Sequence, residues 1–403
     1  MANSSNNLTR RGFLRTACAA GAGAVVGANL HAQAIGGVNV TPTRVLGKTG
    51  IKIPILGLGG EFDIVNNQVM LKQAHKLGVR FWDTAAEYAN SEAGYGAFFE
   101  RNPDLRKDIV LSTKTLKREP KGMTAELDAS LKALQTDCVD LYFIHRLGTP
   151  DELGDWKDEW KAWADQAKKA GKIKFFGVSF HDSVAESLSA VAQNAKWMDV
   201  VMFMFNYRAL ASNKLMKAID AAEEAKLGMI GIKAQALGFV SRPLSDQEKA
   251  AMGRLKGQGY SDWQARLKLL WDSNRVHSAC CLMKNLPQLN ENAAAAIDKA
   301  KLSAADKAAW QQYAQATCNE YCMGCERICG SAVDNLIPVR DILRFLMYHN
   351  AYGDRARARR LFAALPDDVR GRLGRVDYSR AERDCPQRMP IGRLMDEAAR
   401  VLA

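Results

Sequence analysis

The sequence lacks a dense basic tract, a long low-complexity linker and any internal repeat beyond an alternation of apolar runs with helix-like segments. Its 47% hydrophobic and 25% charged residues are average for globular proteins, which disfavours wholesale disorder, a fibrous repeat and a protein with many membrane spans. Lys and Arg outnumber Asp and Glu by 56 to 44. Because no single tract concentrates this surplus, it suits an anionic cofactor or an acidic partner better than nucleic acid. For 403 residues we expect a soluble protein of two or three domains, or one large α/β barrel with an appendage.

The N-terminal segment has the order of an export signal. Arg10 and Arg11 form a pair, a weakly apolar Ala/Gly/Val stretch follows at 17–28, and a small-x-small cleavage site follows at 32–34. The apolar stretch is too short, and its side chains are too small, to span a bilayer permanently. An amphipathic helix of the mature fold is disfavoured because three glycines lower its helix propensity and the segment has no acidic residue. The order resembles a twin-arginine signal, and we predict that residues 1–34 are removed.

Cleavage there would leave 53 basic and 44 acidic side chains, so the mature chain keeps a charge of +9. The twin-arginine export machinery carries proteins that are already folded, often with a cofactor inserted in the cytoplasm. We therefore expect a periplasmic or otherwise exported protein that acquires its cofactor before export.

Eight short apolar runs between residues 44 and 292 alternate with charged, Ala-rich segments typical of helices. Parallel strands need crossover helices, so the alternation predicts a parallel sheet, and the length matches a (β/α)8 TIM barrel. An open doubly wound sheet is the alternative, but no GxGxxG motif follows the first run. We predict an α/β protein with a barrel over residues 35–300 and a mainly helical domain over 301–403. The runs are 55–60, 81–85, 109–115, 138–147, 175–181, 200–207, 228–236 and 278–285.

Four polar residues follow or end successive runs, at the barrel face where active sites are built. They are Asp83, Tyr88 just beyond it, Lys114 and His145. Each has an ordinary structural explanation when taken alone, as a helix cap, a loop aromatic or a hydrogen-bonded core histidine. Lys114, however, directly follows an apolar strand and is costly to desolvate unless a carboxylate meets it, and Asp83 on the neighbouring strand is the natural partner.

The stretches "RVLGKTGIKIPILGLGG", "FWDTAAEY", "LSTKT", "VDLYFIHR" and "FGVSFH" resemble the aldo/keto reductases, over about three quarters of the mature chain. The resemblance implies that Tyr88 donates a proton to a substrate carbonyl while a nicotinamide hydride reaches its carbon. Lys114, oriented by Asp83, would lower the phenolic pKa from its usual value of about 10. His145 would orient and polarise the carbonyl.

The same resemblance implies NADP(H) or NAD(H) as cofactor. Two departures affect the nicotinamide contacts: Phe180 and His181 replace the family's usual asparagine, and Met202 stands where a glutamine is common. Lys284 would meet a 2′-phosphate, although a solvated loop charge is an equal explanation and one lysine does not separate NADP from NAD. The implied cofactor-binding residues are Gly59, Gly60, Ser179, Asn206, Lys284, Gln288 and Asn292, with Glu291 near the adenine.

Five of the nine cysteines lie in the C-terminal quarter of the chain. Of the other four, Cys18 falls in the export segment, and Cys138, Cys280 and Cys281 belong to apolar strands, where we expect small core residues. Structural zinc usually takes two cysteine pairs separated by a longer loop. The C-x3-C-x2-C-x3-C motif, with a remote Cys-Pro downstream, instead resembles the bacterial ferredoxin pattern for a [4Fe-4S] cluster.

In two-cluster ferredoxins the last cysteine of each motif ligates the other cluster. That logic assigns the cluster to Cys318, Cys322, Cys325 and Cys385, with Cys329 as an alternative fourth ligand. The first gap is one residue longer than the pattern, and Gly330 stands where proline is usual. Disulfides are the competing interpretation in an oxidising compartment, but the odd count and folded export oppose it.

Two function hypotheses follow. The first is an exported iron–sulfur oxidoreductase that interconverts a carbonyl and an alcohol on a small polar, sugar-like substrate, with the cluster relaying electrons or supporting the fold. The second is a non-catalytic electron-transfer or binding module on a remnant barrel. Short helices are expected at 339–349 and 355–365, and the arginines of the second form either a solvated face or a docking patch for an acidic redox partner protein.

Overall fold

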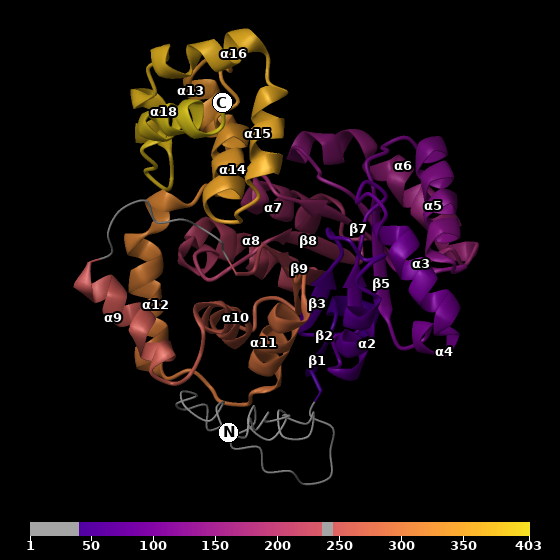
Figure 1. The fold of residues 1–403 in the computed structure, drawn as a ribbon. Helices are drawn as coiled ribbons and strands as arrows, with labels where there is room; N and C mark the ends of the chain where they lie inside the picture. The colour runs from indigo at the N-terminus through magenta and orange to yellow at the C-terminus, as the bar shows by residue number, and fades with distance from the viewer. Residues whose placement is uncertain (1–39, 236–244) are drawn as a thin grey trace, which may run out of the picture.

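The computed structural model describes residues 40–235 and 245–403, and its larger unit is a closed barrel of eight parallel strands (Figure 1). The order around the barrel is β10-β3-β4-β5-β6-β7-β8-β9, so chain neighbours are spatial neighbours. Each predicted apolar run contains one strand, which confirms the barrel and excludes the doubly wound sheet. The predicted export signal at 1–34 lies outside the described residues. The strands are β3 (Leu56–Gly59), β4 (Phe81–Asp83), β5 (Val110–Thr115), β6 (Val139–Ile144), β7 (Ile173–Phe180), β8 (Val200–Met204), β9 (Gly228–Ile232) and β10 (Ser278–Leu282).

Alternate strand residues fill the barrel interior, as the period of two along a strand requires. Phe81, Phe143 and Met202 are among the buried side chains there. A short antiparallel hairpin, β1 (Thr43–Val45) and β2 (Lys52–Pro54), closes one end, with Ile53 packed into the same cluster. The interior is therefore a packed core, and chemistry is confined to the opposite rim.

The segments between strands form the outer helices, and their starts carry the expected signals. Thr149 caps the longest one, which has proline in its first turn, and Asn285 caps another in the same way. The helices of this unit are α2 (Gln68–Lys76), α3 (Ser91–Arg101), α4 (Pro103–Arg106), α5 (Pro120–Leu134), α6 (Pro150–Lys169), α7 (Val184–Asn194), α8 (Asn213–Glu224), α9 (Asp246–Lys256), α10 (Asp262–Asp272), α11 (Leu286–Ile297) and α12 (Ala304–Ala316).

Six further helices form a lobe with its own hydrophobic cluster, built from residues 329–402, on the side of the barrel away from the β1–β2 hairpin (Figure 1). Residues of α12 belong instead to the cluster that surrounds the barrel. The short helices expected at 339–349 and 355–365 are present as α14 and α15. The lobe comprises α13 (Glu326–Ala332), α14 (Val339–Asn350), α15 (Arg355–Ala363), α16 (Asp367–Arg372), α17 (Ser379–Asp384) and α18 (Ile391–Val401).

Ion pairs attach this C-terminal lobe to the barrel rim. Arg344 and Arg340 meet Asp182 at 2.5 and 2.9 Å, and Arg357 meets Glu61 at 2.8 Å. Gly324 comes so close to the rim, with φ +78°, that a Cβ there would lie 2.9 Å from the carbonyl oxygen of His181. Only glycine accommodates both that backbone conformation and that approach. The lobe is therefore held where the strands end.

Among the described helices, none combines the length and the apolar character needed to cross a bilayer.

Candidate active site

Lys114 and Asp83 form a buried ion pair at the strand ends of β5 and β4. The Lys114 ammonium lies 2.6 and 2.7 Å from the two carboxylate oxygens of Asp83 and donates a third hydrogen bond to the carbonyl oxygen of Thr84 at 2.6 Å. Ser112 donates to the same carboxylate at 2.6 Å. Both side chains are almost inaccessible to solvent, at 1% and 6% exposure. A buried pair survives only when its remaining bonds are satisfied, and here they are.

Tyr88 lies on the loop after β4, beside this pair. The Lys114 ammonium is 5.1 Å from the centroid of its ring. Burial, and then the negative charge of Asp83, raise the pKa of Tyr88 well above its ordinary value. This corrects the expectation that Lys114 lowers that pKa. The physical reason is that the ammonium is bound to both oxygens of Asp83, so little of its charge is left to favour a tyrosinate. Tyr88 is accordingly a phenol at neutral pH.

His145 follows β6, and its ring lies edge-on to Tyr88 with 5.7 Å between the ring centroids. Its Nδ1 is 3.3 Å from the carboxylate of Glu87, but the angle is not that of a hydrogen bond, so the buried nitrogen has no such partner in the described chain. Burial, followed by the charges of Lys114 and Arg146, lowers the pKa of His145 to about 2. The imidazole is therefore neutral. All four predicted residues, Asp83 included, meet at one place.

A cavity of about 750 Å³ opens at this rim. Asp83 and Tyr88 contribute one part of its wall, and Gly59 and Gly60 contribute another. A Cβ on Gly60 would lie 2.4 Å from the carbonyl oxygen of Asp83, so glycine is needed for the chain to approach the end of β4 this closely. The far wall comes from the end of β9, from β10 and from Tyr352 of the C-terminal lobe. We call this space the mouth cavity.

The other predicted cofactor residues are not gathered in one place. Ser179 is buried in β7 and accepts a hydrogen bond from the backbone N–H of Arg146 at 3.2 Å. Asn206 is buried after β8 and donates to the Tyr321 hydroxyl at 3.3 Å, so it faces the C-terminal segment. Asn292 accepts a hydrogen bond at 3.0 Å from Gln235, which lines the mouth cavity.

Lys284 and Gln288 are exposed at the start of α11, after β10. The side chain of Gln288 accepts a hydrogen bond from the backbone N–H of Lys284 at 2.8 Å. Pro287 has no N–H and the Gln288 N–H donates to the Asn285 side chain, so this helix start offers an anion little beyond the Leu286 N–H and the exposed Lys284. Lys284 and the mouth cavity are therefore the features here that suit a nicotinamide dinucleotide.

The C-terminal cysteines converge where α13 packs against α17. Burial, and the nearby Cys385 and Cys329, raise the pKa of Cys325 to about 11, and burial raises that of Cys322 to about 12. The Cys318 sulfur lies 3.8 Å from the carbonyl oxygen of Gln387, two residues beyond Cys385. No disulfide joins cysteines of the described chain. Nor do three His, Cys, Asp or Glu side chains within residues 40–235 and 245–403 form a site for a single metal ion.

Of the other cysteines, Cys280 and Cys281 are core residues as expected, whereas Cys138 is not. Cys280 and Cys281 are buried in β10, and Cys138 lies half-buried just before β6.

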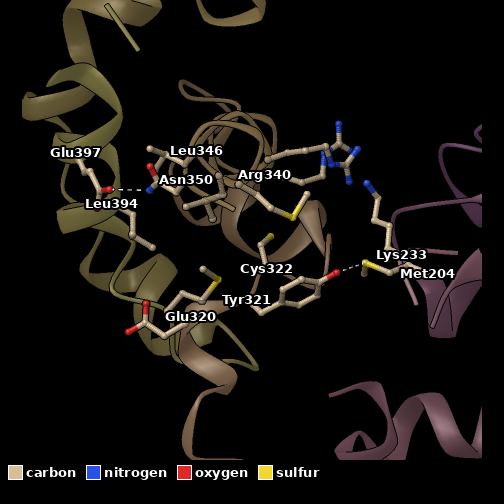
Figure 2. Close-up of a pocket in the computed structure, with 14 residues that line it drawn as sticks. Met204, Lys233, Glu320, Tyr321, Cys322, Arg340, Leu346, Asn350, Leu394 and Glu397 are labelled. Atoms are coloured by element: carbon tan, nitrogen blue, oxygen red, sulfur yellow. Dashed lines mark hydrogen bonds between the residues drawn. The ribbon is translucent and has the colours of Figure 1, made fainter. Parts of the chain in front are cut away.

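A second cavity, of about 720 Å³, lies between the barrel and the C-terminal lobe (Figure 2). Figure 2 shows Met204 and Lys233 on the barrel side facing Tyr321 and Cys322 on the lobe side. The Tyr321 hydroxyl donates to the Met204 sulfur at 3.2 Å. Lys233 lines both this cavity and the mouth cavity, so the two cavities share part of their wall.

Sequence reasoning missed Lys233, which directly follows β9, and the two tyrosines beside it. Its ammonium lies 5.6 and 5.7 Å from the ring centroids of Tyr348 and Tyr352. The sequence did contain an indication of Lys233, because it follows an apolar strand just as Lys114 does. Tyr348 and Tyr352, by contrast, come from a lobe whose placement no motif indicated.

Comparison with known proteins agrees with this architecture. The sequence profile of the aldo/keto reductase family matches residues 55–312, and the chain belongs to that family. The aldo-keto reductase AKR11C1 of Bacillus halodurans has a similar fold, with a TM-score of 0.54 and 20% identity over 68% of this chain and 96% of that one. The protein is thus a TIM-barrel member of the aldo/keto reductase family.

Several curated relatives are enzymes of this type. An uncharacterized oxidoreductase, YrpG, of Bacillus subtilis is 26% identical over 46% of this chain, and the NADP(+) aldo-keto reductase yakc of Schizosaccharomyces pombe is 34% identical over 34%. The chain spans 64% and 45% of the lengths of these two relatives. L-galactose dehydrogenase of Arabidopsis thaliana is 25% identical over 63% of this chain and 88% of its own length.

Proposed function

We propose that the protein interconverts a carbonyl and an alcohol on a small polar substrate at the mouth cavity, with Tyr88 as the acid and base. The observation that carries this proposal is the meeting of Tyr88, His145 and the Lys114–Asp83 pair at one rim. A nicotinamide cofactor bound there supplies or accepts the hydride. Tyr88 donates its phenolic proton to the carbonyl oxygen, and the phenolate takes a proton back from water.

The electrostatics suit the reducing direction. Because the pKa of Tyr88 is raised, the group is present as the proton donor at neutral pH. His145 is neutral and donates a hydrogen bond that orients the carbonyl oxygen without competing as an acid. Lys114, fixed by Asp83, packs its ammonium against the Tyr88 ring and so positions the phenol at the mouth cavity.

The nicotinamide dinucleotide would extend from the mouth cavity, past Gly59 and Gly60, to the start of α11. Lys284 and Gln288 support binding of its phosphates there, and the NADP(+) relative supports the cofactor class. The test is steady-state reduction of a panel of aldehydes with NADPH and with NADH, using wild type and Tyr88→Phe. Turnover with neither cofactor would refute the proposed function.

The cysteine region supports a [4Fe-4S] cluster held by Cys318, Cys322, Cys325 and Cys385, with Cys329 as the alternative to Cys385. A cubane carries one cysteine on each of four irons, so it does not need the single compact ligand shell that zinc requires. The cluster would supply one-electron chemistry, and Lys233 in the shared wall supports a relay toward the mouth cavity.

Iron and sulfide analysis of anaerobically purified protein tests the cluster, with about four irons per chain expected. Comparing Cys385→Ser with Cys329→Ser identifies the fourth ligand, because only the ligand's loss should lower the iron content. Cys138→Ser, in the barrel wall, is the matched control. Zinc in place of iron would overturn the assignment.

Export through the twin-arginine route is part of the same proposal and rests on residues 1–34 alone. Replacing Arg10 and Arg11 together by lysine should retain the protein in the cytoplasm. N-terminal sequencing of the exported form should begin at Ile35, and an intact N-terminus on exported protein would contradict cleavage there.

A further inference from the structure

Lys233 has an environment that neither the fold nor the proposed reaction explains. In the described part of the chain no carboxylate lies within ion-pair distance of its ammonium, which instead faces the rings of Tyr348 and Tyr352. Most buried cations are paired with an anion, as Lys114 is with both oxygens of Asp83. Aromatic faces stabilise a cation without neutralising it.

The backbone at Lys233 adds a second observation. Its φ is +52°, in the left-handed region that a long side chain seldom adopts. Such a conformation costs free energy, and strained residues of this kind concentrate at functional sites. Here the strain occurs at the residue that ends β9 and enters both cavities.

The charges around Lys233 leave a positive surplus. Asp182 is shared by Arg340 and Arg344, and the Glu61 carboxylate is taken by Arg357. Arg340 also pairs with Asp341, so three arginines and three carboxylates balance and Lys233 carries the surplus positive charge. Burial, and the proximity of Arg344, lower the pKa of Lys233 to about 8. An anion entering the mouth cavity would relieve this repulsion.

His181 lines the same cavity and contributes a second unsatisfied group. Its buried Nδ1 has no hydrogen-bond partner among the described residues. Burial, and then the charge of Lys233, lower the pKa of His181 well below its usual value, so the ring is neutral and can give or take one hydrogen bond. A cation and a neutral imidazole on one wall suit an oxyanion.

The position of Lys233 relates this anion site to the reaction. β5 and β9 lie four strands apart in the closed barrel of eight, so Lys114 and Lys233 stand on opposite walls of the rim. Tyr88 and Lys233 both line the mouth cavity. A substrate bound across it can present its carbonyl to Tyr88 and a charged group to Lys233.

We propose that Lys233 binds a carboxylate of the substrate, so that the enzyme selects oxo acids and hydroxy acids over neutral carbonyl compounds. This specificity rests on the proposed function. The phosphates of the nicotinamide cofactor are the other source of anionic oxygens. They have the exposed Lys284 after β10 as a cation of their own, so Lys233 is left for the substrate.

The test compares two aldehydes of similar shape, 4-carboxybenzaldehyde and methyl 4-formylbenzoate, which differ in one negative charge. Wild type should prefer the acid. Lys233→Met should lower kcat/KM for the acid by about 10- to 100-fold, mainly through KM, as expected for loss of one charged hydrogen bond. The ester should be unaffected, and Lys233→Arg should keep most of the preference. Lys217→Met, an exposed lysine on α8, is the matched control.

Binding measurements separate this inference from the proposed function. Equilibrium binding of 4-(hydroxymethyl)benzoate requires no turnover, and Lys233→Met should weaken it by a similar factor. Because Lys233 loses its proton as the pH rises through about 8, the dissociation constant should rise above that pH in wild type but not in Lys233→Arg. The other charged or titratable groups near Lys233 are Arg344, Arg357, Glu61, Asp182, His181, Tyr348 and Tyr352.

The possible results of these experiments distinguish the proposed reductase function from the proposed anion site at Lys233. If wild type reduces neither aldehyde but binds the benzoate through Lys233, the proposed function fails and the anion site stands. If both aldehydes are reduced equally and Lys233→Met changes neither, the anion site is refuted while the reductase stands. A rise in the KM of NADPH or NADH, with no change in acid preference, would assign Lys233 to the cofactor phosphates and overturn the proposal.

Discussion

Two lysines stand on opposite walls of the same barrel rim, and their surroundings differ completely. Lys114 is bonded to both oxygens of Asp83 and is sealed from solvent. Lys233 faces two aromatic rings supplied by the C-terminal lobe. The barrel itself thus supplies the carboxylate that neutralises Lys114, whereas the lobe supplies only aromatic rings to Lys233. We call the side of the rim with the Lys114–Asp83 pair the fixed wall, because its charges are paired within the barrel. We call the side with Lys233 the receptive wall, because its cation faces aromatic rings and can bind an anion.

The largest effect is expected when the ion pair between Lys114 and Asp83 is broken. Lys114→Met leaves the Asp83 carboxylate buried without its cation, and loss of one partner of a buried pair costs about 3–5 kcal/mol. Urea unfolding should show that loss, accompanied by loss of carbonyl reduction. The double variant Asp83→Asn/Lys114→Met should recover much of the stability but none of the activity. A single variant within about 1 kcal/mol of wild type would contradict the assignment of a tightly coupled pair.

Tyr88→Phe tests chemistry on the same wall while leaving the pair intact. Removing a positioned proton donor typically costs 10²- to 10⁴-fold in rate. The unfolding free energy should change little, because the ring still packs against Lys114 and His145. In wild type the raised pKa keeps Tyr88 protonated, so reduction should not decline between pH 7 and 9, whereas alcohol oxidation should speed up as the pH rises. An alkaline fall in the reduction rate in that range would argue against the phenol as the donor.

The two neutral histidines, which follow the neighbouring strands β6 and β7, predict a loss of stability in acid. The folded-state pKa of His145 is lowered to about 2 and that of His181 lies well below its ordinary 6.5. Their contribution to stability is therefore fully present above pH 6.5 and is lost as the pH falls toward the folded-state values. At pH 4.5 the lowered pKa of His145 should cost roughly 2.5 kcal/mol relative to pH 7, and His181 should add to that loss. His145→Asn and His181→Asn should each flatten the measured curve, and an unchanged slope in both would refute this account.

The fixed wall was predictable from sequence, and the receptive wall was not. Asp83, Tyr88, Lys114 and His145 follow apolar runs whose order gives the barrel, so adjacency in the chain becomes adjacency at the rim. The pKa shift of Tyr88 was predicted with the wrong sign, because its main cause, burial of the phenol, depends on how the loop after β4 packs, which spacing does not encode.

Lys233 was hidden within a run interpreted as strand, and the tyrosines that face it are over a hundred residues away in the chain. Their encounter depends on how the C-terminal lobe docks. The Asp182 and Glu61 ion pairs that hold the lobe have no local sequence signature. Charge complementarity between elements so distant in sequence emerges only when the fold is complete.

The smallest expected effect tests whether the lobe holds Lys233 in place. Tyr352→Leu removes one of the two rings near the ammonium, an interaction worth about 0.5–2 kcal/mol, and leaves the barrel intact. We expect binding of 4-(hydroxymethyl)benzoate to weaken by about 2- to 10-fold, with the thermal unfolding midpoint nearly unchanged. Tyr352→Phe keeps the ring and should match wild type. If the phenylalanine variant weakens binding as much as leucine does, the hydroxyl rather than the aromatic face holds the site, and the contrast between the two walls would rest on Lys233 alone.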